Sequence, residues 1–461
     1  MKQLITLLLC MFPLWVNAQT EEEIRKALES YDFETPIAQI APAAGDSVFT
    51  PLRAQALKAM NRHSEALKEW NSILKEDSTN TKVLIELAEC YKLVNRMMGA
   101  TACYEKAVAL HPENKYFRQQ YIRSLLASDK YEEARNSCHA WLDMDSLSAT
   151  AFKFLGMAYE GMVAADNPDA LSNAFMAYNA AYRIDSLDAQ TVAHIASIFN
   201  NNEQYPDAVA VTECYRLTDT LNVDVNRQNA KAYCMMKEYP TAVQRYEGLK
   251  AMGDRSFTTL YYLGVSHYGD NWMYGARDNL LEAHKKAPND INILYYLGKA
   301  SVRSSWKQEG MDYMKAALEI AVPTDSLMAR LYDGLVECQR YVKTDPYERI
   351  ETMKKLYSYN KKYRLFYSIA DIYDRQKDYA NAVHYYEKYM ELVPKNLREA
   401  LDEEGKPLPN AETLYQRVKR RVEKIKVEDF FRNGAHDDYF ENKYMKMIQA
   451  KKDSLDRVKK K

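Results

Sequence analysis

Small residues recur along this chain at a fixed interval, and this recurrence limits the possible folds more than any other feature. The interval is the one that separates Ala66, Ala100 and Ala134, and it is interrupted by a longer step before Ala174 and another before Ala382. A fixed period of about 34 residues is typical of solenoids built from short repeats. The positions are Ala66, Ala100, Ala134, Ala174, Ala208, Ala242, Ala276, Gly310 and Ala382.

A second set of small or modest residues precedes most of these positions by a constant distance, as Ala88 precedes Ala100. Larger apolar residues follow four and seven positions later, and this spacing places them on one face of a helix. Two antiparallel helices can approach to about 8–10 Å where small residues face each other, so each pair predicts a crossing. One hairpin cannot bury its apolar face alone, and stacked neighbours would supply the core. The second set is Ala54, Ala88, Ile122, Ala196, Ala230, Gly264, Gly298 and Ala370.

The pattern resembles the tetratricopeptide repeat (TPR) family. Leu155-Gly156 with Tyr159, Leu263-Gly264 and Leu297-Gly298 match the first half of its signature, and Ala276, Ala283 and Pro288 match the second. The resemblance covers about residues 49–394. It implies an all-α fold, a right-handed superhelical solenoid of antiparallel helix hairpins. A different helical-hairpin solenoid is the alternative.

The repeat divides the chain into an array and two flanking segments. We expect about ten units over 49–394, with an insertion near 161–174 and a divergent unit at 325–361 that lacks the small-residue pair. Asn167-Pro168 are expected to start the helix after the insertion. Residues 19–48 are interpreted as a degenerate hairpin that caps the array, and 395–461 as a capping helix, about 411–426, with a basic helical tail. That tail is either a solvated helix or a contact for acidic polymers or lipid headgroups.

Residues 1–18 have the pattern of a secretory signal peptide. Lys2 precedes an apolar run from Leu4 to Val16, and Ala18 ends a small-residue cleavage site. The run is too short for a helix that spans a bilayer of about 30 Å. We therefore expect an exported protein, most simply in the periplasm of a Gram-negative bacterium, that is not transmembrane once the signal is cleaved. A short buried helix or membrane anchor is the alternative.

Composition excludes some classes of partner and chemistry. The net charge of −1 gives no reason to expect nucleic-acid binding. Six cysteines remain after cleavage, and we interpret them as small buried residues, with oxidation of Cys90 and Cys103 left open. The eight histidines are scattered and no catalytic motif is present. We expect no enzyme activity, no metal and no cofactor.

In solenoids of this kind the first helices of successive hairpins line a groove. The positions left exposed there carry cations and tyrosines, the residue types that dominate binding interfaces. A merely solvated face is the alternative. The predicted function is a non-catalytic envelope scaffold that binds a peptide segment or partner protein, acidic in character; the alternative is an accessory subunit of an outer-membrane assembly or secretion complex. The candidate groove residues are Arg123, Lys153, Arg227, Lys231, Tyr261, Tyr295, Lys299, Arg303 and Tyr367.

Overall fold

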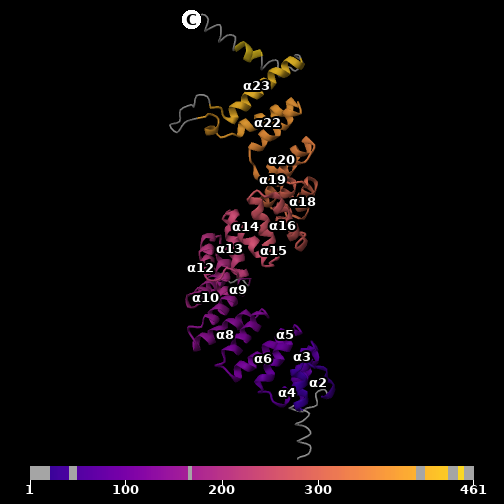
Figure 1. Cartoon of the computed structure of the whole chain (residues 1–461). Coiled ribbons are helices and arrows are strands. Elements are labelled where there is room, and N and C mark those ends of the chain that lie inside the picture. Colours follow the sequence, from indigo (N-terminus) through magenta and orange to yellow (C-terminus); the bar gives the residue numbers. More distant parts are fainter. Residues whose placement is uncertain (1–20, 41–48, 165–168, 401–410, 434–444, 451–461) are drawn as a thin grey trace, which may run out of the picture. The chain divides into compact units, whose positions relative to one another are not determined.

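The computed structural model describes residues 21–40, 49–164, 169–400, 411–433 and 445–450. It divides the chain into two compact units, Met1–Ala232 and Tyr233–Lys461, and each is described by itself. Every regular element in the described ranges is a helix (Figure 1). The all-α expectation is therefore confirmed for the part of the chain that the structure describes.

The first unit is a series of helices of similar length. Residues 21–29 are helical and lead into the numbered elements. These are α2 (Glu34–Gln39), α3 (Phe49–Ala59), α4 (His63–Glu76), α5 (Thr81–Leu93), α6 (Met97–Leu110), α7 (Lys115–Leu126), α8 (Tyr131–Met144), α9 (Ala149–Gly161), η1 (Met162–Ala164), α10 (Ala170–Ile184), α11 (Ala189–Asn201), α12 (Tyr205–Arg216) and α13 (Val223–Met235), within which the unit ends.

The second unit continues the same pattern. Its elements are α14 (Tyr239–Ala251), α15 (Phe257–Gly269), α16 (Met273–Lys286), α17 (Ile291–Val302), α18 (Lys307–Ile320), α19 (Asp325–Tyr341), α20 (Pro346–Asn360), α21 (Arg364–Arg375), α22 (Tyr379–Leu392), η2 (Lys395–Leu397) and α23 (Leu414–Asn433). Residues 445–450 are also helical. Helices that follow one another pack together, as in the hairpins α15–α16, α17–α18, α19–α20 and α21–α22.

The start of most hairpins is fixed by a capping side chain. An Asn, Asp, Ser or Thr accepts a hydrogen bond from a backbone N–H two or three residues further on, which satisfies a donor that has no partner inside the helix. These caps recur with the same period as the small residues, apart from one longer step that spans the insertion. They are Asn80, Asn114, Ser148, Asp188, Asn222, Ser256, Asp290 and Thr324.

The turn inside many hairpins contains one residue with a positive φ, which lets the chain reverse within a few residues. Asn61, Asn95 and Asp129 hold this left-handed conformation, and Asn271 does so at 63°. Asn and Asp tolerate it better than most residues. Glu203, Lys237 and Lys377 adopt it at equivalent places without that advantage.

The small residues lie where the two helices of a hairpin cross, as predicted. A Cβ atom added at Gly310 of α18 would lie 2.6 Å from the carbonyl oxygen of Gly298 in α17. A Cβ added at Gly264 of α15 would lie 3.2 Å from the carbonyl oxygen of Ala276 in α16. All of the repeated alanines from Ala66 to Ala276 are fully buried. The regular recurrence is thus a packing requirement.

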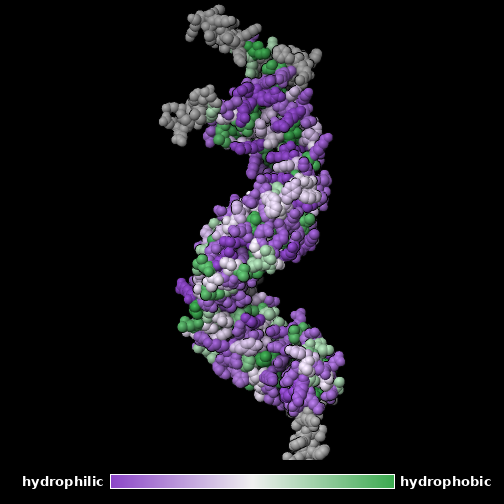
Figure 2. Space-filling model, in the orientation of Figure 1, coloured by the Kyte–Doolittle hydropathy of each residue, from purple (hydrophilic) through white to green (hydrophobic). Residues whose placement is uncertain are grey.

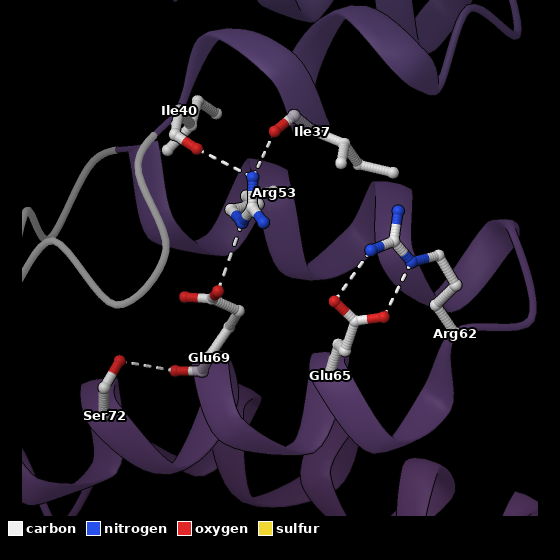
Figure 3. A network of polar contacts seen from close by, with 7 residues as sticks. All are labelled: Ile37, Ile40, Arg53, Arg62, Glu65, Glu69 and Ser72. Atoms are coloured by element: carbon white, nitrogen blue, oxygen red, sulfur yellow. Dashed lines mark hydrogen bonds and ion pairs between the residues drawn. The ribbon is translucent and has the colours of Figure 1, made fainter.

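A buried arginine ties the segment before the array to the first hairpin (Figure 3). Arg53 of α3 donates from Nε to Glu69 Oε1 of α4 at 3.1 Å, and both side chains are buried. Its Nη1 donates to the carbonyl oxygens of Ile37 and of Ile40, the latter at 2.7 Å. These bonds hold the end of α2, whose carbonyls would otherwise lack partners.

The other end of the array is covered by α23. Val418, Val422 and Ile425 are buried in one core with residues of α21 and α22. Arg421 makes a two-pronged ion pair with Asp374 of α21, at 2.8 and 2.6 Å. This helix therefore buries the last apolar face of the second unit.

Two other expectations differ in detail or fall outside the description. α10 begins at Ala170, with Asp169 at its N-cap, and Asn167 and Pro168 lie outside the described residues. The segment 1–18 also lies outside them.

Cys90 and Cys103 are both free and buried, and burial raises the pKa of each thiol to about 11. Among the described helices, none is long and apolar enough to cross a membrane.

Candidate functional site

The first helices of successive hairpins contact one another and form what we call the inner row. In the second unit α17 contacts both α15 and α19, so side chains from three different hairpins meet there. The first unit has the same relation between α7 and α9. A surface of this kind collects residues that lie about one repeat apart in the sequence.

Tyrosines of the second unit form a connected group on this row. Tyr268 of α15 meets Tyr296 of α17 with ring centroids 5.6 Å apart, and Tyr295 lies 5.2 Å from Tyr296. Tyr261 stacks on Phe257 within α15. Tyr261, Tyr268 and Tyr296 are half-buried, whereas Tyr295, which was predicted to be exposed, is buried between α17 and its neighbours. We call Tyr261, Tyr268, Tyr295 and Tyr296 the aromatic strip.

Three cations lie over the aromatic strip. Arg330 of α19 lies 4.3 Å from the ring centroid of Tyr295, and Arg303 lies 5.4 Å from that of Tyr268. Lys299 Nζ is 5.0 Å from the Tyr295 ring and 5.3 Å from the Tyr268 ring. The tyrosine faces attract these charges and hold them in place.

The charges are only partly balanced. Lys299 pairs with Glu337 of α19 at 2.8 Å. Arg303 instead donates to the side-chain amide of Asn271 at 2.7 Å, and Arg330 donates to that of Asn292 at 2.8 Å. Those amides carry no charge. Within the described residues, the strip therefore holds two guanidinium groups that have no carboxylate partner.

Lys299 keeps its charge in the ion pair with Glu337. Burial disfavours its charge, but the Glu337 carboxylate and the tyrosines around it outweigh burial, so the pKa of Lys299 lies above its ordinary value. Lys299 is therefore charged throughout the physiological range and already has its partner. An incoming anion is expected at Arg303 and Arg330.

The face seen in Figure 2 is mostly hydrophilic over the described residues of the second unit, with hydrophobic residues scattered among them. No group of His, Cys, Asp and Glu in the described ranges has the arrangement needed to hold a metal ion. The arrangement of cations on aromatic rings suits the binding of carboxylates and extended chain segments.

The predicted groove residues of the first unit have partners of their own. Lys153 binds Asp188, the cap of α11, at 3.0 Å, and Arg227 binds Asp224 one turn away at 2.8 Å. Lys231 donates to Asn201 at 3.1 Å, and burial lowers its pKa. Arg123 lies over the ring of Phe154 at 5.7 Å. The contacts of Lys153, Lys231 and Arg123 join neighbouring hairpins, whereas that of Arg227 lies within α13, so each residue has a structural role.

The candidate residues thus belong to separate groups. Tyr261, Tyr295, Lys299 and Arg303 come together in the second unit. Tyr367 of α21 packs instead against Tyr386 and Tyr389 of α22, at 6.1 and 5.8 Å. That the candidate groove residues bind a partner stays a prediction.

Sequence reasoning missed Arg330, Tyr268 and Tyr296. Arg330 lies in the divergent unit, where the small-residue pair that set the register is missing. A signal was nevertheless present, because Arg330 follows Tyr296 by one full repeat and therefore occupies the equivalent place on the next first helix.

Comparisons with known proteins agree with the repeat architecture. Residues 45–141 match the model of a family described as the N-terminal TPR repeats region of Psidin. FK506-binding protein 59 of Drosophila melanogaster is 32% identical over 76 residues, which is 16% of this chain and 17% of that protein. The chain therefore spans less than a fifth of the curated relative that it matches.

Solved structures resemble this chain only at low similarity. Yeast Tom70 has 11% identity and a TM-score of 0.33, with 92% of this chain and 98% of that chain covered. A tetratricopeptide repeat protein from Parabacteroides merdae has 13% identity and a TM-score of 0.39, with 55% and 98% covered. Identities and TM-scores this low do not indicate what this chain binds. What the comparisons add is that residues 45–141, whose described part lies in the helices α3 to α8, match a TPR family model.

Proposed function

We propose that this chain is a non-catalytic scaffold that binds an acidic segment of a partner protein on the aromatic strip. One observation carries the proposal: Arg303 and Arg330 are held on tyrosine faces by neutral amides, with no carboxylate partner among the described residues. Guanidinium groups bind carboxylates through paired hydrogen bonds. A partner with Asp, Glu or a C-terminal carboxylate would complete both sites.

The tyrosines would supply most of the contact area. Tyr261, Tyr268 and Tyr296 are half-buried and present a rigid aromatic face and a hydroxyl group, and such residues lose little conformational freedom on binding. A segment that contacts both Tyr268 and Tyr296 would touch two successive first helices. Binding would then depend on the stacking of hairpins as well as on single side chains.

We further propose that the scaffold works in the bacterial envelope. The support is the signal-like pattern of residues 1–18. The alternative role, as an accessory subunit of an outer-membrane assembly or secretion complex, draws on the basic tail, which has eight Lys and Arg from Lys443 onward. Removal of that tail separates the two roles, because only the accessory subunit needs it for docking.

A peptide selection tests the binding proposal. Random peptides displayed on phage are selected on residues 19–461, and the enriched sequences are measured by fluorescence anisotropy. We expect enrichment of Asp and Glu, and an affinity loss of about ten-fold or more when Arg303 and Arg330 are both changed to Gln, since each removes a charged hydrogen bond. Arg255→Gln is the matched control, because Arg255 already has a carboxylate partner, Glu282 of α16.

Two results would reject the proposal. One is a selection that yields no acidic peptides. The other is an equal loss of affinity in Arg255→Gln and in the double variant, which would show that net charge alone matters. Binding by the double variant should also respond less to salt than binding by the wild type, because two of the charges that salt screens are gone.

A further inference from the structure

Three arginines converge at one end of two neighbouring hairpins, away from the aromatic strip. Arg340 lies in the last turn of α19, Arg349 near the start of α20, and Arg375 is the last residue of α21. α19 and α20 lie side by side in the second unit (Figure 1). These arginines take no part in the proposed binding of an acidic segment.

Two contacts fix these helix ends against one another. The side chain of Gln339, next to Arg340, donates from Nε2 to Thr352 Oγ1 at 3.1 Å, and Thr352 lies one turn after Arg349. The rings of Tyr347 and Tyr373 meet at 6.0 Å, each two residues before an arginine of the cluster. The proximity of the arginines therefore follows from one buried hydrogen bond and one ring contact between the helices.

The cluster carries excess positive charge. Arg375 pairs with Asp371 at 2.9 Å. Neither Arg340 nor Arg349 has an ion pair within the described residues. Burial lowers the pKa of Arg349, and so do the charges of Arg340 and Arg375, while Asp371 offsets this only in part. Three guanidinium groups and one carboxylate leave a net charge of about two.

Arg349 also has an unsatisfied donor. Its Nε is buried and makes no hydrogen bond. A buried donor without a partner destabilises the fold, and so does a group of like charges. Asp345, at the start of α20, is not the partner of the free Arg349 donor. Its carboxylate caps the helix and accepts a hydrogen bond from the backbone N–H of Tyr347 at 3.2 Å. A bound anion would satisfy the free donor and balance the charge.

We propose that Arg340, Arg349 and Arg375 form a binding site for a doubly charged tetrahedral oxyanion, a phosphate or sulfate group. Planar guanidinium groups match the paired oxygens of such groups, and a double negative charge matches the excess at the site. The anion is supplied either free in solution or as a monoester headgroup. It binds between two hairpins and thereby stabilises their junction.

The test uses residues 19–461 titrated with sodium phosphate at constant ionic strength, with chloride as the balancing anion. Calorimetry gives the affinity, and the thermal midpoint gives the stabilisation that binding produces. We expect one site in the wild type. Arg349→Gln should lose about ten-fold or more in affinity, and its midpoint in chloride should equal or exceed that of the wild type because the unsatisfied donor and one like charge are gone.

Two further variants make the result decisive. Arg340→Gln changes an exposed residue of the cluster, so it should fold normally and still weaken phosphate binding. Arg364→Gln changes an exposed arginine at the opposite end of α21 and should bind as the wild type does. The proposal is overturned if the wild type shows no saturable phosphate binding, or if Arg340→Gln and Arg349→Gln bind phosphate as tightly as Arg364→Gln.

Glycerol 3-phosphate identifies the source of the anion. Binding as tight as that of inorganic phosphate would show that the site accepts a monoester headgroup. Binding of inorganic phosphate or sulfate alone would show that the site encloses a free ion. Either result supports the oxyanion site, and both differ from the peptide measurements on the aromatic strip, so failure of one proposal leaves the other intact.

Discussion

Gly310→Ala should destabilise the second unit although alanine is the better helix former. The added Cβ would lie 2.6 Å from the Gly298 carbonyl oxygen and 2.8 Å from the backbone nitrogen of Val302, where ordinary contact begins at 3.4 Å. Both are backbone atoms of α17, so no side chain can rotate away. α17 and α18 must separate by several tenths of an ångström along their crossing.

Two opposing effects set the size of the loss. Overpacking of a close contact costs about 1–3 kcal/mol. Replacing Gly by Ala inside a helix contributes up to about 1 kcal/mol in the other direction. Because the clash is with backbone, we take the upper part of the first range and expect a net loss of about 1–2 kcal/mol.

Gly248→Ala is the matched control, because it makes the same chemical change within a helix of the same unit. An added Cβ at Gly248 of α14 meets nothing within 4 Å. This variant should gain a few tenths of a kcal/mol, up to about 1. Urea unfolding followed by circular dichroism gives both values, and hydrogen exchange shows whether the loss lies in α17 and α18. A neutral or stabilising Gly310→Ala would refute the packing argument.

Arg53→Met should cost about 3 kcal/mol or more, since it breaks a buried ion pair and removes the donor to two carbonyls; proteolysis that leaves the segment before α3 as resistant as in the wild type would contradict this. Burial would raise the pKa of Glu160, but hydrogen bonds from His194 and Tyr178 outweigh burial, so the pKa lies below its ordinary value. Its carboxylate therefore adds stability above the ordinary carboxyl pKa, and this is lost as the pH falls through the lower folded value; the stability difference between wild type and Glu160→Gln should shrink in acid, and a constant difference would contradict the assignment. Exported protein should have the mass of a chain that begins after Ala18, and a mass that includes residues 1–18 would indicate an anchor.

The helix pairs could be predicted from the sequence because each helix crossing requires small residues. A small residue such as Gly310 or Ala276 is needed wherever two helix backbones come close. Because every hairpin has such a crossing, the small residues recur with the period of the repeat. The caps from Asn80 to Thr324 carry the same period and could have set the helix starts directly. The helix after the insertion was less accessible, since a longer turn removes the constraint that fixes the register.

The candidate site was only partly accessible, for a different physical reason. A charged residue on an inner helix looks the same in sequence whether it is free or paired. Lys153 and Lys299 both find carboxylates about one repeat further on, at Asp188 and Glu337. Arg303 and Arg330 find amides instead. That distinction depends on side-chain reach across the helix row, which periodicity does not encode.

The ladder of contacts between successive hairpins has a consequence for how the chain acquires its structure. Even the ion pair that fastens α23 joins residues only 47 positions apart, Asp374 and Arg421, in a chain of 461. Contacts of such short sequence separation require little loop closure before they form, so folding is expected to be fast for a chain of this size. Any hairpin pair can serve as a nucleus from which order spreads to its neighbours. Pulled from its ends, each unit should accordingly give way in a succession of small steps, one or two hairpins at a time.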